Sequence, residues 1–381
     1  KCSVYFDLIP DSEKPTLSIL TLSTDTNITV TANANDNVGI YYYYFQLDNE
    51  EEIRVEENTH TFEGLEKDSV HTVTVRVEDA AGNVASDSKE VIVGLKGGNF
   101  ILASENAPTG HTTDWTDEES YYYTGKPDNW VQFAGFYWRI IRINGDGTIR
   151  MIYQGIEANE IGSETQIGEV EFNSLDYRNN MYVGYMYTNN QLQGLGRSST
   201  IKTKLDRWYT QNIANKPEVQ YIDGNAGFCG DRRTSSGDGI GINDTIYQPY
   251  TRISNNNPSL SCEKIDIYTT NENNIGNKAL TYPIGLISAD EAMLAGIPNW
   301  NSSNLDSFLY TKQDYWTMTP YYYNNMGGDG ARIFLIASNG NLSDTNNWVN
   351  NSRGVRPVIN LKSDVQLTGS GTTTDPFVVV S

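Results

Sequence analysis

The chain carries near its C-terminus the apolar blocks Ala331-Arg332-Ile333-Phe334-Leu335-Ile336 and Val355-Arg356-Pro357-Val358-Ile359-Asn360-Leu361. Their β-branched and aromatic composition predicts two buried strands. Runs of Tyr and Asn lie around them, at 321–325 and 346–351. Rigid aromatic side chains and adaptable amides on a stiff frame are the residue mixture of recognition surfaces. The segment therefore favours a ligand-binding face over a catalytic pocket.

The candidate ligand-contact residues share one segment and four residue types. Trp348 is the strongest of them, because amides flank it and central aromatic anchors contribute most of the binding energy in interfaces. An alternative stays open, since Asn and Tyr also cluster at 41–44 and 255–257, as an AT-rich genome would produce. The full set of candidates is Tyr321, Tyr322, Tyr323, Asn324, Asn325, Asp329, Asn339, Asn341, Asp344, Asn346, Asn347, Trp348, Asn350 and Asn351.

Charge and hydropathy restrict the partners. The chain has 381 residues, a formal net charge of −21 and a pI near 4.5. We expect no nucleic acid partner, because phosphate binding needs a basic face, and an anionic membrane surface is disfavoured for the same reason. The sequence has no run of 18 apolar residues, so we expect no direct membrane insertion by this chain.

The N-terminus and the cysteines point to an exported protein. The chain opens at Lys1-Cys2 without a signal peptide. We therefore expect residues 1–12 to be a stub, and the protein to be extracellular and anchored to a cell surface through a segment upstream of residue 1. A Cys229–Cys262 disulfide is expected in that setting, with two buried free thiols as the alternative. Cys2 remains open as a lipidated terminus, an intermolecular partner or a remnant of the anchor region.

Residues 13–95 predict a small all-β domain. Alternating or β-branched runs recur along the segment, separated by turns such as Asp36-Asn37-Val38-Gly39 and Glu78-Asp79-Ala80-Ala81-Gly82-Asn83. The segment resembles the bacterial immunoglobulin-like spacer domains of surface proteins, in which an Asp-x-x-Gly-Asn turn precedes the last strand. That resemblance implies an immunoglobulin-like β-sandwich. Asp36 and Asp79 either cap their turns or ligate a structural calcium ion, and we expect no other cofactor.

Residues 99–381 predict an α+β domain in which strands outnumber helices. The boundary before it is the stretch Gly94-Leu95-Lys96-Gly97-Gly98. A β-hairpin is expected over 136–153, because two apolar runs flank an Asn-Gly-Asp-Gly turn. Helices are expected at 199–213 and at 288–294, the second opened by a Ser-x-x-Glu capping box. The fold class is thus β-rich, with two domains.

The second domain carries a series of motifs in a set order: Asn129-Trp130-Val131-Gln132-Phe133-Ala134-Gly135-Phe136-Tyr137-Trp138-Arg139-Ile140-Ile141-Arg142, Met181-Tyr182-Val183-Gly184-Tyr185-Met186-Tyr187, the helix at 199–209, Leu280-Thr281-Tyr282-Pro283-Ile284-Gly285-Leu286-Ile287, Tyr315-Trp316-Thr317-Met318-Thr319-Pro320 and Gly354-Val355-Arg356-Pro357-Val358-Ile359. This series resembles a large family of surface proteins from Gram-positive gut bacteria. Its terminal Gly-Val-Arg-Pro-Val is similar to the Gly-Phe-Arg block that ends the C-type-lectin-like fold of formylglycine-generating enzymes.

The resemblance implies a C-type-lectin-like domain, with a twisted sheet, two helices and an irregular face for ligands. In the diversified members of this fold, a diversity-generating retroelement rewrites adenine-containing codons near the C-terminus. The scaffold stays constant while Asn, Tyr, Asp and Ser change on the binding face. The resemblance implies the same variable role for residues 321–351.

The sequence offers few residues that could form a catalytic site. The histidines are His60, His71 and His111, and the sequence has neither a His-x-x-x-His helix nor a Cys-x-x-Cys pair for a transition metal. A Ser/His/Asp triad would have to use His111, because the other two histidines fall in the first domain. No cysteine follows Cys262, so the late cysteine pair of formylglycine-generating enzymes is missing. A glycosidase-type carboxylate pair is not excluded by counting.

These features favour a non-enzymatic cell-surface receptor or adhesin, a monomeric ectodomain that binds an unidentified extracellular protein or glycan. One alternative is an extracellular enzyme of the same fold that acts on a surface glycan or peptide, and it needs a deep pocket with a perturbed carboxylate. Another is a structural surface-layer or pilus subunit. It needs a self-complementary patch, which the net charge of −21 disfavours mildly.

Overall fold

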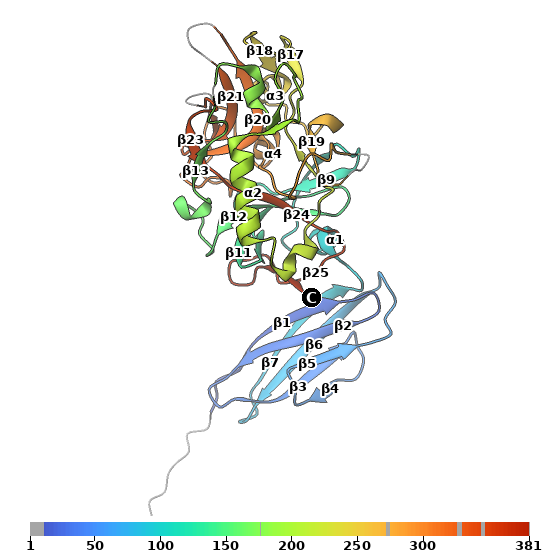
Figure 1. The fold of residues 1–381 in the computed structure, drawn as a ribbon. Helices are drawn as coiled ribbons and strands as arrows, with labels where there is room; N and C mark the ends of the chain where they lie inside the picture. The colour runs from blue at the N-terminus through green and yellow to red at the C-terminus, as the bar shows by residue number, and fades with distance from the viewer. Residues whose placement is uncertain (1–10, 176, 272–274, 326–329, 344–346, 381) are drawn as a thin grey trace, which may run out of the picture. The chain divides into compact units, whose positions relative to one another are not determined.

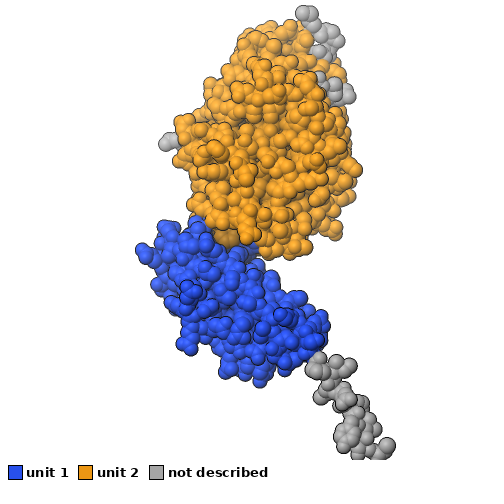
Figure 2. Space-filling view, turned by 180° about the vertical axis from the view of Figure 1, so that it is seen from behind, with its two compact units in different colours: residues 1–96, 366–369, 380–381 blue, residues 97–365, 370–379 orange. Residues whose placement is uncertain are grey.

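The computed structural model describes residues 11–175, 177–271, 275–325, 330–343 and 347–380. It divides into two compact units (Figure 2). The first contains residues 1–96 together with 366–369 and 380–381, and the second contains 97–365 and 370–379. The predicted second domain, 99–381, therefore differs from the second unit at its C-terminal end, where two short segments group with the first unit.

The first unit is a two-sheet β structure, and its strands follow the apolar alternation of the sequence. The alternation is clear in the strands at 28–35 and 70–79, and residues such as Val30, Phe45, Val75 and Val91 are buried between the sheets. One sheet has the order β1-β2-β5 and the other β4-β3-β6-β7 (Figure 1). The strands are β1 (Thr16–Ser23), β2 (Ile28–Asn35), β3 (Ile40–Leu47), β4 (Ile53–Val55), β5 (Thr59–Phe62), β6 (Val70–Asp79) and β7 (Val84–Ile92).

The second unit contains a central sheet whose path runs β24-β12-β11-β10-β26. The predicted hairpin is confirmed, because β11 and β12 pair antiparallel on either side of a turn at 144–148. Two further strands extend this sheet, since β9 pairs β11 and β8 pairs β9. The strands are β8 (Gly110–Thr113), β9 (Glu119–Tyr122), β10 (Trp130–Phe133), β11 (Phe136–Ile143), β12 (Ile149–Gly155), β24 (Val358–Leu361) and β26 (Phe377–Val380).

A second sheet of this unit carries the Tyr- and Asn-rich C-terminal segment. Its path runs β13-β23-β20-β18-β17, and β21 and β22 continue it from β20. The apolar block at 331–336 forms a strand as predicted, whereas the block at 355–361 becomes a strand only from Val358. The strands are β13 (Glu169–Glu171), β17 (Thr234–Ser236), β18 (Thr245–Tyr247), β20 (Tyr315–Tyr323), β21 (Ala331–Ile336), β22 (Leu342–Ser343) and β23 (Ser352–Gly354).

Short elements complete the second unit, and most of them lie in the loop-rich middle of the chain. β14 pairs β15, and β16 pairs β19. These strands and the 3-10 turns are β14 (Met186–Tyr187), β15 (Arg197–Ser198), β16 (Phe228–Cys229), β19 (Ile267–Tyr268), and the turns Ser163–Thr165, Asn180–Val183, Pro217–Tyr221 and Lys264–Asp266. The strand β25 (Gln366–Thr368) belongs to the first unit.

The helices are α1 (Gly97–Leu102), α2 (Thr200–Asn212), α3 (Gln248–Ser254) and α4 (Ala289–Leu294). Ser199 is the N-cap of α2, since its side chain accepts a hydrogen bond from the backbone of Lys202. Trp208 of α2 packs on Trp138 and Tyr153, which fixes the helix against β11 and β12. The sequence patterns predicted α2 and α4 but not α1 and α3. No helix in the described part of the chain is long and apolar enough to cross a membrane.

A buried ion cluster centred on Glu291 ties α4 to β11 and β12. Glu291 accepts hydrogen bonds from Arg142 Nε at 3.0 Å and from Arg150 Nη2 at 3.2 Å. It also completes the predicted capping box, because its Oε2 accepts from the backbone of Ser288 at 2.9 Å. Burial raises the pKa of Glu291, but the two guanidiniums outweigh that effect and the pKa is lowered, so the carboxylate is ionised.

The predicted disulfide joins Cys229 of β16 to Cys262, with Cα atoms 6.2 Å apart. Replacing both cysteines by serine is expected to lower the free energy of unfolding by about 3–4 kcal/mol in the chain-entropy model. The reason is that the bridge closes a loop of sequence separation 33 in the unfolded chain. Urea denaturation measures the change, with Cys2→Ser as the control. An unchanged unfolding free energy in the double variant would contradict the expectation.

Candidate functional site

Five side chains from four separate segments form a continuous series on the second unit, which we call the aromatic row. Trp300 stacks on Tyr250 at 5.7 Å between ring centroids, and Tyr250 meets Tyr322 edge-on at 5.8 Å. The Arg332 guanidinium then lies 5.0 Å from the Tyr322 ring and 4.8 Å from the Trp348 ring. The four rings are each half-buried, so part of the surface of every ring remains accessible.

A helix, two strands and an isolated bridge position four of the five members of the aromatic row, and Trp300 lies in a turn. Tyr250 lies on α3, which packs beside β18 and β20 (Figure 1). Tyr322 is at the end of β20 and Arg332 at the start of β21, and these two strands pair antiparallel. Trp348 forms an isolated antiparallel bridge with Arg332. The sheet therefore holds the rings in one series, with the guanidinium placed where the negative ring faces attract it.

The structure contradicts the expected exposure of four candidate contact residues. Tyr321, Tyr323, Asn341 and Asn347 are only 3%, 2%, 6% and 0% exposed, so the expectation that they are presented to a ligand is wrong. The cause is that β20 is covered on both faces up to its last residues, and Tyr321 packs edge-on against Phe334 at 4.7 Å. A run of tyrosines in such a strand fills the core as readily as it faces solvent.

The other candidates divide between accessible positions and positions that the structure does not describe. Tyr322, Asn324, Trp348 and Asn351 are half-buried, and Asn325, Asn339 and Asn350 are exposed. Asp329, Asp344 and Asn346 lie outside the described residues.

Trp348 departs from the expectation of a fully exposed anchor. Its ring is half-buried against Arg332, and its Nε1 is buried with no hydrogen-bond partner among the described residues. An unpaired buried N–H costs free energy, so this edge of the ring does not stabilise the fold.

Sequence reasoning missed Tyr250, Trp300 and Arg332. A signal for Trp300 was present, because Asn299 and Asn301 flank it in the way that amides flank Trp348. Tyr250 follows the short, irregular segment of β17 and β18, where no periodicity reveals a helix. Arg332 looked like an ordinary strand residue.

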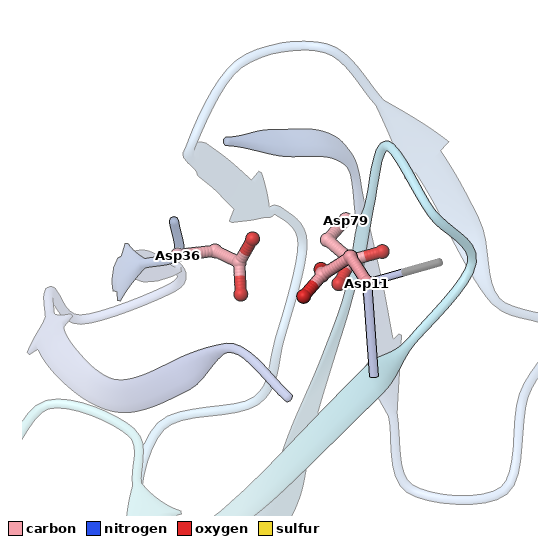
Figure 3. A group of neighbouring side chains, drawn as sticks. All are labelled: Asp11, Asp36 and Asp79. Atoms are coloured by element: carbon pink, nitrogen blue, oxygen red, sulfur yellow. The ribbon is translucent and has the colours of Figure 1, made fainter. Parts of the chain in front are cut away.

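Three carboxylates from separate segments of the first unit lie close together (Figure 3). One carboxylate oxygen each of Asp11, Asp36 and Asp79 lies within 4.8 Å of the others. Asp36 and Asp79 also cap their turns as predicted, Asp36 at Val38 and Asp79 at the backbone amides of Ala81 and Asn83. Hard oxygen ligands at this spacing suit calcium, which needs six or more and would take the rest from water or backbone carbonyls.

The electrostatics of the carboxylate group depend mainly on Asp79, which is 1% exposed. Burial raises the pKa of Asp79, but hydrogen bonds from the Asn83 side chain and backbone outweigh it, so the pKa is lowered and the group is charged. Asp36 Oδ2 is buried without a hydrogen-bond partner among the described residues. Structural calcium, which the sequence left open as the alternative to turn capping, has a matching donor set here and stays an untested alternative.

The first unit also contains a Ser–His–Asp hydrogen-bond relay. His71 Nδ1 lies 2.8 Å from Asp48 Oδ2, and His71 Nε2 lies 2.9 Å from Ser69 Oγ. The expectation that such a relay would have to use His111 is therefore wrong, because strand pairing brings Asp48 to His71. Ser69 Oγ also donates to the Glu66 carbonyl oxygen. The relay thus joins two turns at one end of β6, and a structural role accounts for every contact in it.

Comparisons with known proteins find structures that are similar to parts of this chain. No protein-family model matches the chain, and no curated protein matches it. The PKD1 domain of the Vibrio cholerae metalloprotease PrtV is 17% identical over 22% of this chain and 99% of its own, with a TM-score of 0.20. The PKD1 domain of Vibrio anguillarum Epp is 14% identical over 22% and 98%, also at 0.20.

A third solved structure, the chitinase ChiA74 from Bacillus thuringiensis, is 16% identical over 44% of this chain and 21% of its own, with a TM-score of 0.21. Likenesses at these TM-scores say nothing about activity. The chain is β-rich, has several sheets and one disulfide among its described residues, and has PKD-type domains among its structural neighbours.

Proposed function

We propose that the protein is an extracellular ligand-binding receptor or adhesin, and that its second unit is a C-type-lectin-like domain. The ligand, a protein or a glycan, binds on the aromatic row. The observation that carries the proposal is the row itself, in which half-buried rings run in series from Trp300 to Trp348 beside the loops of Asn325 and Asn350. Rings that their neighbours already hold lose little side-chain entropy when they bind.

The chemistry of the aromatic row favours recognition over catalysis. Its members are aromatic rings and one guanidinium, and these groups bind partners through stacking, cation–π contact and hydrogen bonds. At neutral pH none of them readily serves as a general acid or base. The enzyme alternative acting on a surface glycan or peptide would need a different part of the unit.

The extracellular setting is supported by the disulfide, since such bonds persist in oxidising compartments. In this proposal the first unit is a spacer, and the ectodomain is monomeric. The structural-subunit alternative predicts filaments, so light scattering that rises with protein concentration would favour it over a receptor.

If the binding face is diversified by a retroelement, the structure predicts which positions vary. If a retroelement rewrites the C-terminal segment, variation should concentrate at accessible positions such as Tyr322, Asn325, Asn339 and Asn350. The buried candidates, Tyr321 and the three others in the core, should stay constant, because core substitutions cost several kcal/mol.

Deep sequencing of the codons for 314–356 across cells of one culture measures this pattern. Adenine-position changes that spare the buried positions would support a diversified receptor without a single ligand. An invariant segment would leave a receptor of one specificity, and equal variation at buried and accessible positions would contradict the assignment of the face.

A further inference from the structure

Arg139 is a buried cation without a carboxylate. Arg139 is only 4% exposed, yet no carboxylate oxygen of a described residue lies within 4.0 Å of its guanidinium. The two other deeply buried arginines of β11 and β12 are compensated, since Arg142 and Arg150 share Glu291. Buried charges in proteins are normally paired, so the exception requires an explanation.

Neutral groups hold Arg139 in place. Its Nε donates to Asn129 Oδ1, and its Nη2 donates to the Pro127 carbonyl oxygen at 2.9 Å. The guanidinium lies 4.2 Å from the Trp130 ring centroid and 5.3 Å from that of Phe308. These contacts orient the group and leave Nη1 without a hydrogen bond to any described residue. A planar donor held in this way is preorganised for an oxygen acceptor.

Arg139 lines a cavity of about 380 Å³ in the second unit. Its aromatic wall is the half-buried ring of Tyr310, beside Trp130 and Phe308, which also line the cavity but are only 2% and 4% exposed. Lys126 and Lys312 stand at the exposed rim together with the carboxylates Asp128 and Glu160, so the rim charges balance. The buried charge of Arg139 therefore makes the electrostatic potential inside the cavity positive.

A second buried cation increases the positive potential around Arg139. Arg356 is 1% exposed and donates only to neutral oxygens, those of Tyr153, Leu309, Gln154 and the Tyr315 hydroxyl. Burial, and to a smaller extent the charge of Arg356, lowers the pKa of Arg139 to about 9 against the raising effect of Glu160 and Asp128. The guanidinium is thus still charged at neutral pH but is poorly stabilised.

We infer that this cavity binds the carboxylate of an acidic sugar, with Arg139 as the carboxylate ligand. A carboxylate would accept hydrogen bonds from Nη1 and supply the missing counter-charge, and the apolar face of one sugar ring would pack on the aromatic wall. A cavity of about 380 Å³ accommodates one such ring. None of the aromatic row lines the cavity, so the inference does not depend on the proposed function.

Isothermal titration of the full chain with sodium glucuronate tests the inference, with glucose as the neutral sugar and sodium acetate as the bare carboxylate. We expect glucuronate to bind more tightly than either. Arg139→Gln is expected to weaken glucuronate binding about 10- to 100-fold, the range for a charge-assisted hydrogen bond.

Two rim variants keep the test decisive if Arg139→Gln does not fold. Lys312→Asn removes a positive charge at a position whose φ of 60° asparagine tolerates, and should weaken binding about 2- to 5-fold. Glu160→Gln removes a negative charge and should strengthen binding by a similar factor. Equal affinity for glucuronate and glucose would overturn the inference, and so would unchanged glucuronate affinity in both rim variants. If acetate bound as tightly as glucuronate, the claim that the ligand is a sugar would be wrong.

Discussion

Replacing Glu291 by glutamine is expected to lower the free energy of unfolding by about 3–5 kcal/mol. The substitution retains the size of the side chain and an oxygen that can accept from the Ser288 backbone, so the helix cap can persist. It removes the charge that compensates Arg142 and Arg150, and all three side chains are 1% exposed. The buried guanidinium of Arg150 would then be left without a counter-ion, and that of Arg142 would keep only Asp114, whose Oδ2 lies 3.5 Å from its Nη1.

Urea denaturation at neutral pH measures this change. The matched control is Asp306→Asn, which removes a carboxylate from a solvent-exposed pair with Lys126 at 3.1 Å. Exposed pairs contribute about 0–1 kcal/mol, so the control should unfold almost as the unmodified protein does. Equal and small losses in the two variants would show that the Glu291 cluster does not stabilise the second unit.

Trp316→Ala is expected to cost about 3–5 kcal/mol of stability, as large-to-small changes of buried aromatic residues do. Trp316 lies in β20 with 0% exposure, packs edge-on against Phe172 at 6.0 Å, and donates from Nε1 to the Val170 carbonyl oxygen at 2.9 Å. Its removal leaves a cavity and an unpaired carbonyl group beside β13.

Thermal unfolding of Trp316→Ala should be compared with that of Trp348→Ala. Trp348 is half-buried and its Nε1 has no described partner, so its truncation should lower the melting temperature far less. A Trp348→Ala variant that unfolds as early as Trp316→Ala would make Trp348 a core residue and would remove it from the proposed ligand face.

Local rules accounted for much of the fold. The capping box of Ser288 and Glu291, the N-cap Ser199 and the strand at 331–336 all depend on residues near one another in sequence. Such features are readable because a cap or a strand pattern is complete within a few residues. The ion pairs of Glu291 were not readable, since their partners lie about 140 residues away on β11 and β12.

The candidate site was predicted less well, for a reason that lies in tertiary packing. Tyr321, Tyr322 and Tyr323 are the same residue type, so the sequence does not distinguish them. In the structure both faces of β20 are covered except near its end, where Tyr322 alone is half-buried. Tyr250 and Trp300 join Tyr322 from segments that no sequence pattern links. The missing counter-charge of Arg139 is likewise visible only once its neighbours in space are known.

The most direct test of the proposed ligand face is a pair of affinities. A glycan array and a panel of extracellular proteins first provide the tightest binder, and surface plasmon resonance then compares its affinity for Tyr322→Ala, Trp348→Ala and Tyr41→Ala, the last being an exposed tyrosine of the first unit. We expect losses of about 2 kcal/mol or more for the two face variants, with near-normal melting temperatures, and none for the control. Unchanged affinity in both face variants would contradict recognition through the aromatic row.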